Sequence, residues 1–508
     1  MSKKVKSLIL GLTKTQWRKI RRIADVHFIQ LTTGAIIYLI CPKTTIDPQA
    51  MAMIQSLYSR DPATILKHLI EVSEKGAEKF MAQFYVNYGH KSIGDCGNIL
   101  IAVEGVSMIA TKAIQDSQLY AGQEASTRYI DFSNQAFLDP SQGNIVIPIE
   151  IGNARNRAQI LQENWRAFYM ENLPLVQAYV MEQNPFEGFD FTEQLEKNPK
   201  TDTRALWKKT MYSRAFDIMR GFLPSGATTC VAWWTSISHA GDHLSWLRCH
   251  VLPEVSELAL KTEELLKSVY PSSFTRKVDP NREAYKTMWY RDDYFLTKDN
   301  RGFNGGNYPR EYLFDLHQNL SKHYKKYVLE RPAGVELPWQ IGEASVIRWT
   351  DLIDFGSFRD IQRHRAVVQR IGLITDDYGF HEWYLQNLPP DLVPKAERFI
   401  KNQLEEINSL GLDDNARQYF LPMGMKVPIQ ITGSLSKIVY LVELRCQNTV
   451  HPTLHAITFN FVEALRRNLA KNLEVGPEEI PFYISRKVGE ISLKRGTQDI
   501  IKKEEVVN

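Results

Sequence analysis

The pattern of apolar and polar residues predicts a pair of β-strands near the start of the chain. The segments HFIQLTT and AIIYLIC, which lie between His27 and Cys41, are apolar and rich in β-branched residues, as strands are. Thr33 and Gly34 are suited to the turn that would join them. A second apolar run, Ile99 to Val106, predicts another buried segment.

Helical signals alternate with these runs. A proline that follows an aspartate favours the first turn of a helix, because its fixed φ suits that position and its missing N–H is not needed there. Asp47-Pro48 and Asp61-Pro62 carry this signal, and the second of these helices is expected to run through Glu74. Further helices are expected at 76–88, 107–118, 153–183, 203–220, 243–267 and 453–473.

The second half of the chain repeats the first faintly. Ala344 to Asp354 stands in for Gly97 to Ser107, and Leu421-Pro422 stands in for Leu223-Pro224. We therefore predict an α+β protein with two related domains, each a small mixed or antiparallel sheet flanked by helices with a long central helix. The expected parts are a basic arm at 1–24, a first domain at 25–270 with an insertion at about 133–200, a linker or exposed loop at 271–310, a second domain at 311–495 and a charged tail at 496–508.

The composition is that of an ordinary globular protein. Of the 508 residues, 44% are hydrophobic and 24% are charged, and the net charge of +4 is too small to indicate a nucleic-acid-binding protein by itself. The five cysteines form no CxxC pair, so neither a disulfide framework nor a metal site is expected. The longest apolar run, Gly34 to Cys41, is far shorter than the ~20 residues that span a bilayer. Reduced thiols and the absence of a membrane span predict a cytoplasmic protein.

The candidate chemistry is concentrated in Asp116 to Phe132, which reads DSQLYAGQEASTRYIDF. This segment is unusually dense in hydrogen-bonding groups for one that follows a buried-looking run. Arg128 offers a planar guanidinium suited to a phosphate or carboxylate, and Ser126 adds a hydroxyl two residues away. A single Ser-x-Arg is most often ordinary surface, so its neighbours decide its meaning.

The neighbouring motifs point to a known family. Gly89-His90-Lys91-Ser92 precedes the segment, and Arg220-Gly221-Phe222-Leu223-Pro224 and Leu247-Arg248 follow it. Together they resemble the flavin-dependent thymidylate synthases, whose motifs run GHxS, EGxS, RHRxxSxxExSxRY, RxxLP and a helical Leu-Arg. Positions 124 to 129 fall in register with ExSxRY, but Asp116, Ser117 and Gln118 occupy the RHR positions.

The missing RHR occurs in the second half. Counted from Asp354 as from Ser107, Arg363-His364-Arg365 takes the place of Asp116-Ser117-Gln118. The second copy has no Ser-x-Arg after it, so each copy retains a different half of the motif. The resemblance therefore predicts a divergent, tandem two-copy member of the family, with one hybrid site built from both copies.

The resemblance implies a reaction and its participants. The expected reaction is reductive methylation of deoxyuridylate (dUMP), or a related pyrimidine nucleotide, at uracil C5, with FAD as cofactor and NADPH and methylenetetrahydrofolate as co-substrates. A homo-oligomer, a dimer of pseudo-dimers, is also implied, because family sites lie between subunits. By motif position the catalytic residues are Arg248, Arg363, His364 and Arg365, the substrate-binding residues are Glu124, Ser126, Arg128, Tyr129, Arg220 and Arg445, and the cofactor-binding residues are His90, Ser92 and Asp95.

Two other functions stay open. The second copy has Ser434 and Ser436 where the family has flavin contacts, which favours a non-catalytic nucleotide-binding or scaffold protein on the same fold. Residues 1–24 carry eight basic residues and no acid, which indicates either a solvated basic helix or a contact with nucleic acid.

Overall fold

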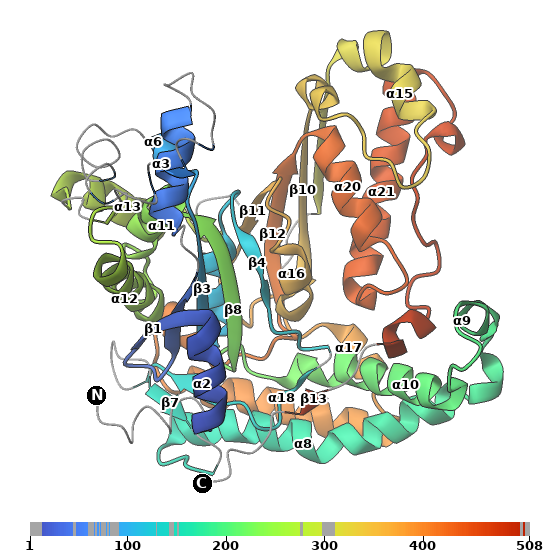
Figure 1. Ribbon diagram of the computed structural model, residues 1–508. Helices are drawn as coiled ribbons and strands as arrows, with labels where there is room; N and C mark the ends of the chain where they lie inside the picture. Colours follow the sequence, from blue (N-terminus) through green and yellow to red (C-terminus); the bar gives the residue numbers. More distant parts are fainter. Residues whose placement is uncertain are drawn as a thin grey trace.

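The computed structural model describes residues 13–43, 47–58, 91–128, 130–141, 147–149, 152–274, 278–296, 310–497 and 501–502, together with positions 66, 69, 70, 72, 78 and 81. These residues form two antiparallel sheets flanked by helices, which confirms the predicted α+β class. Figure 1 shows the two sheets side by side above a layer of long helices. No described helix is long and apolar enough to cross a membrane.

The first sheet has the strand order β1-β2-β3-β8-β4. Its strands are β1 (Ala24–Gln30), β2 (Ile36–Pro42), β3 (Asn98–Ser107), β8 (Thr228–Ser236) and β4 (Ala121–Glu124). The predicted hairpin is confirmed, because β1 pairs with β2 and Gly34 turns the chain at a φ of 81°, which glycine adopts without steric cost. Helices α7 (Met108–Gln115), α11 (Ile237–Leu247) and α12 (Pro253–Val269) pack against this sheet.

The second sheet repeats the order of the first. Its order β11-β12-β10-β9 matches β4-β8-β3-β2 strand for strand. The strands are β11 (Val368–Ile371), β12 (Lys426–Gly433), β10 (Ser345–Asp354) and β9 (Glu311–Leu316). Strands β10 and β11 begin 247 residues after β3 and β4 (345 − 98 and 368 − 121). The faint repeat of the sequence is therefore a repeat of structure, in the register that the sequence predicts.

In each copy a hydrogen bond from a hydroxyl to a carboxylate links the start of one helix to a second helix. Ser107 caps α7, and its hydroxyl donates to the buried carboxylate of Glu254 on α12 at 2.6 Å. In the second copy Asp354 caps α16 (Phe355–Ile361), and the hydroxyl of Thr453 on α21 (Pro452–Leu473) donates to it at 2.6 Å. The hydroxyl and the carboxylate have exchanged places. Each pair satisfies buried polar groups that would otherwise cost free energy.

The two Leu-Pro segments meet where the copies join. Pro224 and Pro422 form an antiparallel bridge. Ser225 N donates to Leu421 O at 2.8 Å, and Met423 N donates to Leu223 O at 2.8 Å. Because these bonds relate corresponding segments, they run through the centre of the pseudo-symmetric pair.

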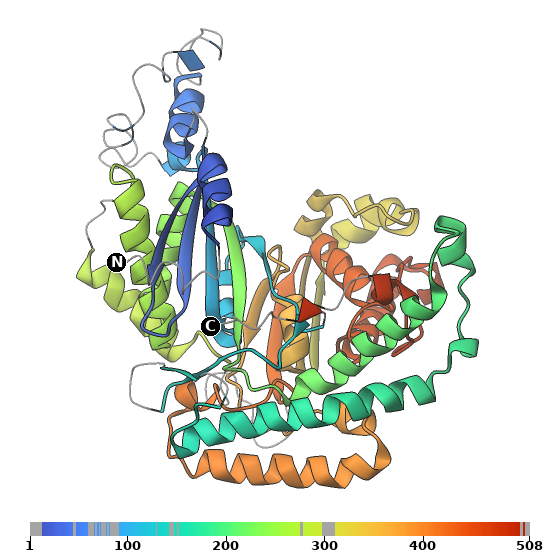
Figure 2. The ribbon, with the colours of Figure 1, turned by 60° about the horizontal axis from the view of Figure 1, so that its bottom comes forward.

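Long helices below both sheets tie the copies together (Figure 2). The expected insertion supplies α8 (Arg157–Gln183), which packs against α10 (Thr203–Met219) and against α18 (Val393–Asn408) of the second copy. Trp165 and Phe168 of α8 lie with their ring centroids 4.9 Å and 4.4 Å from that of Phe399 on α18. Packing of these apolar rings between α8 and α18 stabilises the pairing of the two copies.

Several expected boundaries differ from the structure. The supposed linker contains α13 (Pro280–Asp292), whose Asp279 cap and Pro280 start a helix by the signal already used at Asp47-Pro48. The supposed charged tail contributes β13 (Ile501–Lys502), which pairs in parallel with β5 (Ile130–Asp131). The helices expected at 61–74 and 76–88 fall largely outside the described residues.

The remaining elements complete the two copies. They are α2 (Lys14–Ile23), α3 (Pro48–Tyr58), α6 (Lys91–Gly94), β6 (Phe137–Asp139), β7 (Ile147–Ile149), η2 (Phe186–Gly188), α9 (Thr192–Lys197), η3 (Arg220–Phe222), η4 (Leu320–Tyr324), α15 (Lys325–Leu329), η5 (Trp339–Ala344), α17 (Glu382–Gln386), η6 (Pro390–Leu392), α19 (Asp414–Arg417), α20 (Leu435–Arg445), η7 (Pro477–Glu479) and η8 (Leu493–Thr497).

Candidate functional site at the junction of the two copies

The two halves of the split motif lie in contact. The second-copy segment that follows α16 reaches the strand β4 of the first copy. Arg363 Nη1 donates to Gln123 Oε1 at 2.8 Å, and Arg365 donates to the backbone oxygen of Tyr120. The juxtaposition expected from the sequence is therefore present within one chain.

Glu124 joins the copies through four donors. Thr111 and Gln115 of the first copy donate to its carboxylate, each at 3.1 Å. Gln362 of the second copy donates at 2.9 Å, and Arg359 forms a close ion pair with it. The side chain of Glu124 is buried, with 4% of it exposed. Glu124 therefore acts as a bridge between copies, which departs from the substrate contact expected of it.

Arg128 lies at the same junction and already has carboxylate partners. Its Nε donates to Asp217 at 2.8 Å, its Nη2 donates to the backbone oxygen of Thr449 at 2.9 Å, and Asp360 lies 3.9 Å away. Ser126 Oγ accepts from the backbone N–H of Arg128 at 3.2 Å and so fixes the local turn. Tyr129 lies outside the described residues.

Asp217 is the buried centre of this network. Its side chain is 0% exposed and forms ion pairs with both Arg128 and Arg495. Burial opposes its charge, but the two arginines outweigh burial and hold the pKa of Asp217 well below its usual range. The sequence pattern missed this residue, although an acid three positions before Arg220 in an otherwise buried helix is a signal. Nothing in the sequence around Arg495 indicates its role.

Arg220 approaches the network from the start of η3. Its side chain is 1% exposed, its Nη2 donates to Ser357 Oγ at 3.0 Å, and Asp360 lies 3.8 Å away. Both partners belong to the second copy, on α16. Arg220 therefore links the two copies through its positive charge, as Glu124 links them through its negative charge.

Arg445 differs from Arg128 and Arg220 in its side-chain partner, which is a histidine. Its Nε donates to Nε2 of His364 at 2.8 Å. Among the described residues no carboxylate oxygen lies within 4.0 Å of its guanidinium. Burial, together with the charges of Arg363 and Arg128, lowers the pKa of Arg445, and Asp360 only partly opposes this. A half-buried cation in this position favours an anion beside it.

The junction carries an excess of positive charge. Among the described residues, the network named in the next sentence holds six guanidiniums and three carboxylates, an excess of three positive charges (6 − 3). The guanidiniums belong to Arg128, Arg220, Arg359, Arg363, Arg445 and Arg495, and the carboxylates belong to Glu124, Asp217 and Asp360. A phosphate monoester brings roughly 1.5 to 2 negative charges at neutral pH, so the excess suits one such group.

The pseudo-symmetric counterpart of this junction is filled. The chain that follows α13 crosses it, where Leu296 N donates to Ile371 O at 3.0 Å. Tyr294 lies over Lys112, with 5.8 Å between its ring centroid and Nζ. A cavity of only about 20 Å³ remains beside these residues. The connecting segment thus fills one of the two junctions. The junction that holds the split motif is called the open junction below.

Arg248 lies on the side of the filled junction, called the closed side, which corrects its expected place beside Arg128, and it lines a separate cavity of about 540 Å³. Its Nη1 donates to Glu263 at 2.6 Å, and its Nε and Nη2 donate to Glu283 of α13 at 2.9 and 2.7 Å. Arg445 is its counterpart at the open junction. The physical reason is that the supposed linker folds as a helix and supplies the carboxylate that neutralises Arg248.

Of the three expected flavin contacts, the structure describes Ser92 and Asp95, and Asp95 lies at one end of the first sheet. His90 lies outside the described residues, and Ser92 is exposed. Asp95 accepts from Ser236 Oγ at 3.5 Å and from Ser238 Oγ at the start of α11. On β8 the exposed Trp234 is paired with Ala121, next to the Tyr120 carbonyl that Arg365 contacts. An open indole and the guanidiniums of RHR thus share this end of the sheet.

Lowering the pH from 7 to 5 is expected to destabilise the fold. Burial, then the charges of Arg445 and Arg363, lower the pKa of His364 to about 3, and burial lowers the pKa of His250 to about 3. An unfolded histidine has a pKa near ~6.5, so below that pH the unfolded state binds more protons and stability falls as the pH falls. Thermal unfolding followed from pH 7 to pH 5 checks this, and a constant midpoint would contradict it.

Comparisons with known proteins agree with the motifs. The family model described as thymidylate synthase complementing protein matches residues 43–272. A UPF0159 protein of Thermoplasma acidophilum is 22% identical over 484 residues, which cover 82% of this chain and 93% of that protein. A UPF0159 protein of Chlamydia pneumoniae is 22% identical over 447 residues, which cover 77% of this chain and 79% of that protein. The matches to these relatives are long enough to include both copies.

Proposed function

We propose, for a chain that is a divergent two-copy member of the thymidylate synthase complementing protein family, that the open junction binds dUMP and supports its reductive methylation at uracil C5. The observation that carries the proposal is Arg445, a half-buried cation with no described carboxylate within 4.0 Å. It lies in a cluster with excess positive charge, built from the motif halves of both copies. A nucleotide phosphate would neutralise that excess.

The residues of this chain would divide the work by charge. Arg445 and Arg363 are the arginines that an anion can reach, since both are partly exposed and neither has a carboxylate within 4.0 Å among the described residues. Arg128 is more deeply placed, and its guanidinium would be shared between the phosphate and Asp217. Methyl transfer to uracil C5 builds negative charge on the ring carbonyls, which a fixed guanidinium stabilises. His364 stays neutral, and as an acceptor it holds the Arg445 side chain in place.

The residues at the end of the first sheet suit a flavin nucleotide. Guanidiniums such as Arg365 pair with a pyrophosphate, and an exposed indole such as Trp234 offers a stacking surface for an aromatic ring. Bound there, FAD would supply reducing equivalents obtained from NADPH, while methylenetetrahydrofolate would supply the carbon. The proposal also includes assembly of several copies of the chain, which light scattering of the purified protein would test.

A non-catalytic nucleotide-binding protein is the second candidate. The observation that favours it is that Arg128 and Arg220 are engaged by Asp217 and Asp360. Such internal partners reduce the charge that is available to a substrate. Under this alternative the nucleotide binds and no methyl transfer follows.

Calorimetry and an activity assay separate the candidates. One dUMP is expected to bind per chain, because the counterpart junction is filled. Deoxyuridine, which lacks the phosphate, is expected to bind at least roughly 100-fold more weakly, since charge-assisted bonds are lost. Release of tritium from dUMP labelled at C5, in the presence of FAD, NADPH and methylenetetrahydrofolate, supports the enzyme. Binding without release supports the second candidate, and no binding of dUMP sinks both.

A further inference from the structure

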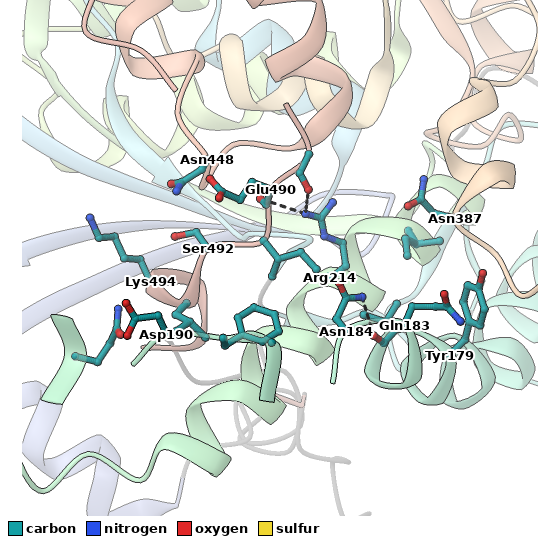
Figure 3. Close-up of a pocket in the computed structure, with 18 of the residues that line it drawn as sticks. Tyr179, Gln183, Asn184, Asp190, Arg214, Asn387, Asn448, Glu490, Ser492 and Lys494 are labelled. Carbon is teal, nitrogen blue, oxygen red and sulfur yellow. Dashed lines mark hydrogen bonds between the residues drawn. The ribbon is translucent and has the colours of Figure 1, made fainter. Parts of the chain in front are cut away.

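A cavity of about 720 Å³ is lined by Arg214 and Ile218 of α10 together with residues of neighbouring elements. Its wall includes residues of α8, α9, α10 and α17 and the segment 489–494. Figure 3 shows Arg214 of α10 within this wall, between Glu490 and Asn184. The residues of the split motif do not line it, so it is a separate feature of the fold.

Arg214 is a buried cation with an N–H donor that forms no hydrogen bond to the described residues. Its residue is 7% exposed, and Nη2 donates to the backbone oxygens of Gly489 and Glu490 at 2.9 and 3.5 Å. Its Nε is buried and has no hydrogen-bond partner in the described part of the chain. Among the described residues no carboxylate oxygen lies within 4.0 Å of the guanidinium. Burial lowers the pKa of Arg214 to about 10, against the opposing effect of Asp217, and the group remains charged at neutral pH.

An unpaired buried donor of this kind costs free energy unless a ligand or water satisfies it. The amide side chains around the cavity add further donors and acceptors, and the Oε1 atom of Gln194 is buried with no partner among the residues that the structure describes. The lining thus offers one deep cationic donor and a ring of uncharged hydrogen-bonding groups. Ligand sites commonly combine a formed cavity with a few such convergent groups.

The acids of the lining have partners outside the cavity centre. Glu193 pairs with Lys197 at 2.6 Å and with Lys494 at 3.6 Å, and Glu490 pairs with Lys487 at 3.2 Å. Asp190 accepts from Thr192 Oγ1 at 2.6 Å. These carboxylates and the nearby backbone oxygens would repel a doubly charged phosphate. A singly charged carboxylate, which needs only one or two donors, suits Arg214 better.

We propose that this cavity is a binding site for a small carboxylate-bearing molecule that also carries amide-like groups. Its carboxylate would accept from the guanidinium of Arg214, and its amide-like groups would pair with the amide side chains of the wall. The residues that line this cavity differ from the residues of the proposed nucleotide site. A failure of one therefore leaves the other standing.

Ligand-observed NMR on the full chain tests the proposal with named probes. N-acetylglutamine carries one carboxylate and two amides, its carboxamide derivative lacks the carboxylate, and inorganic phosphate lacks the amides. N-acetylglutamine is expected to bind, with the carboxamide at least tenfold weaker and phosphate not detectable. Saturating dUMP should not displace it. If N-acetylglutamine does not bind, or binds no better than its carboxamide, the proposal is overturned.

Two variants locate the binding. Arg214→Gln removes the cation and should abolish binding of N-acetylglutamine. Because this change touches a buried residue, Gln183→Glu provides a second route, since Gln183 is exposed at the cavity and the new carboxylate should weaken binding at least threefold. Gln340→Glu makes the same change at an exposed residue that does not line the cavity and should leave binding unchanged. Binding that survives both cavity variants would overturn the assignment.

Discussion

Replacing Arg445 by glutamine is expected to weaken the binding of dUMP about 30- to 100-fold. The guanidinium is half-buried, has no described carboxylate within 4.0 Å and lies within the excess positive charge of the junction. Removing a buried charge that pairs with a ligand costs about 2 to 3 kcal/mol, and each 1.4 kcal/mol is tenfold in affinity. Isothermal calorimetry of the variant and the parent protein, at the same ionic strength, measures the change.

The pseudo-symmetry provides a matched control for this substitution. Arg248 occupies the corresponding place on the closed side, where Glu263 and Glu283 neutralise it. Arg248→Gln should therefore leave the affinity for dUMP within about twofold of the parent. If Arg248→Gln weakens binding as much as Arg445→Gln does, the nucleotide site is not the open junction, and Arg248 regains the role that its motif position implies.

Replacing Asp217 by asparagine is expected to destabilise the protein by about 3 to 5 kcal/mol. The side chain is fully buried between Arg128 and Arg495, and removing one partner of a buried ion pair leaves the remaining charges uncompensated. The effect should appear as a lower midpoint of urea unfolding. The pKa of Asp217 is held well below its usual range. The stabilisation from this carboxylate is therefore present at neutral pH and is lost only as the pH falls below the pKa of an ordinary aspartate.

An exposed aspartate gives the comparison for that experiment. Asp391→Asn removes the same charge from the surface, where the expected change is within about 0.5 kcal/mol. A double substitution of Asp217 and Arg495 should cost less than the sum of the single changes, since the two groups interact directly. Equal, small effects of Asp217→Asn and Asp391→Asn would show that the buried network does not hold the junction together.

The connecting segment illustrates how far sequence patterns reach. Residues 271–310 are rich in proline, aspartate, asparagine and glycine, and their composition predicts a loop. The structure instead places a helix at Pro280–Asp292 and uses the chain after it to fill the second junction. Local composition reflects the free energy of forming a helix or a loop in isolation from the rest of the chain. It does not include the stabilisation from Arg248, Tyr290 and their neighbours, which exists only after the chain has folded.

The sequence by itself determined the repeat, its register and the division of one motif between two copies. These features follow from residue spacing along the chain, and spacing survives when identities diverge. The tertiary structure alone decided that Arg363 meets Gln123, that Asp217 and Arg495 are the partners hidden behind Arg128, and that Arg248 and Arg445 have different surroundings. Those outcomes depend on contacts between residues 35 to 278 positions apart, where burial and neighbouring charge set the state of each group.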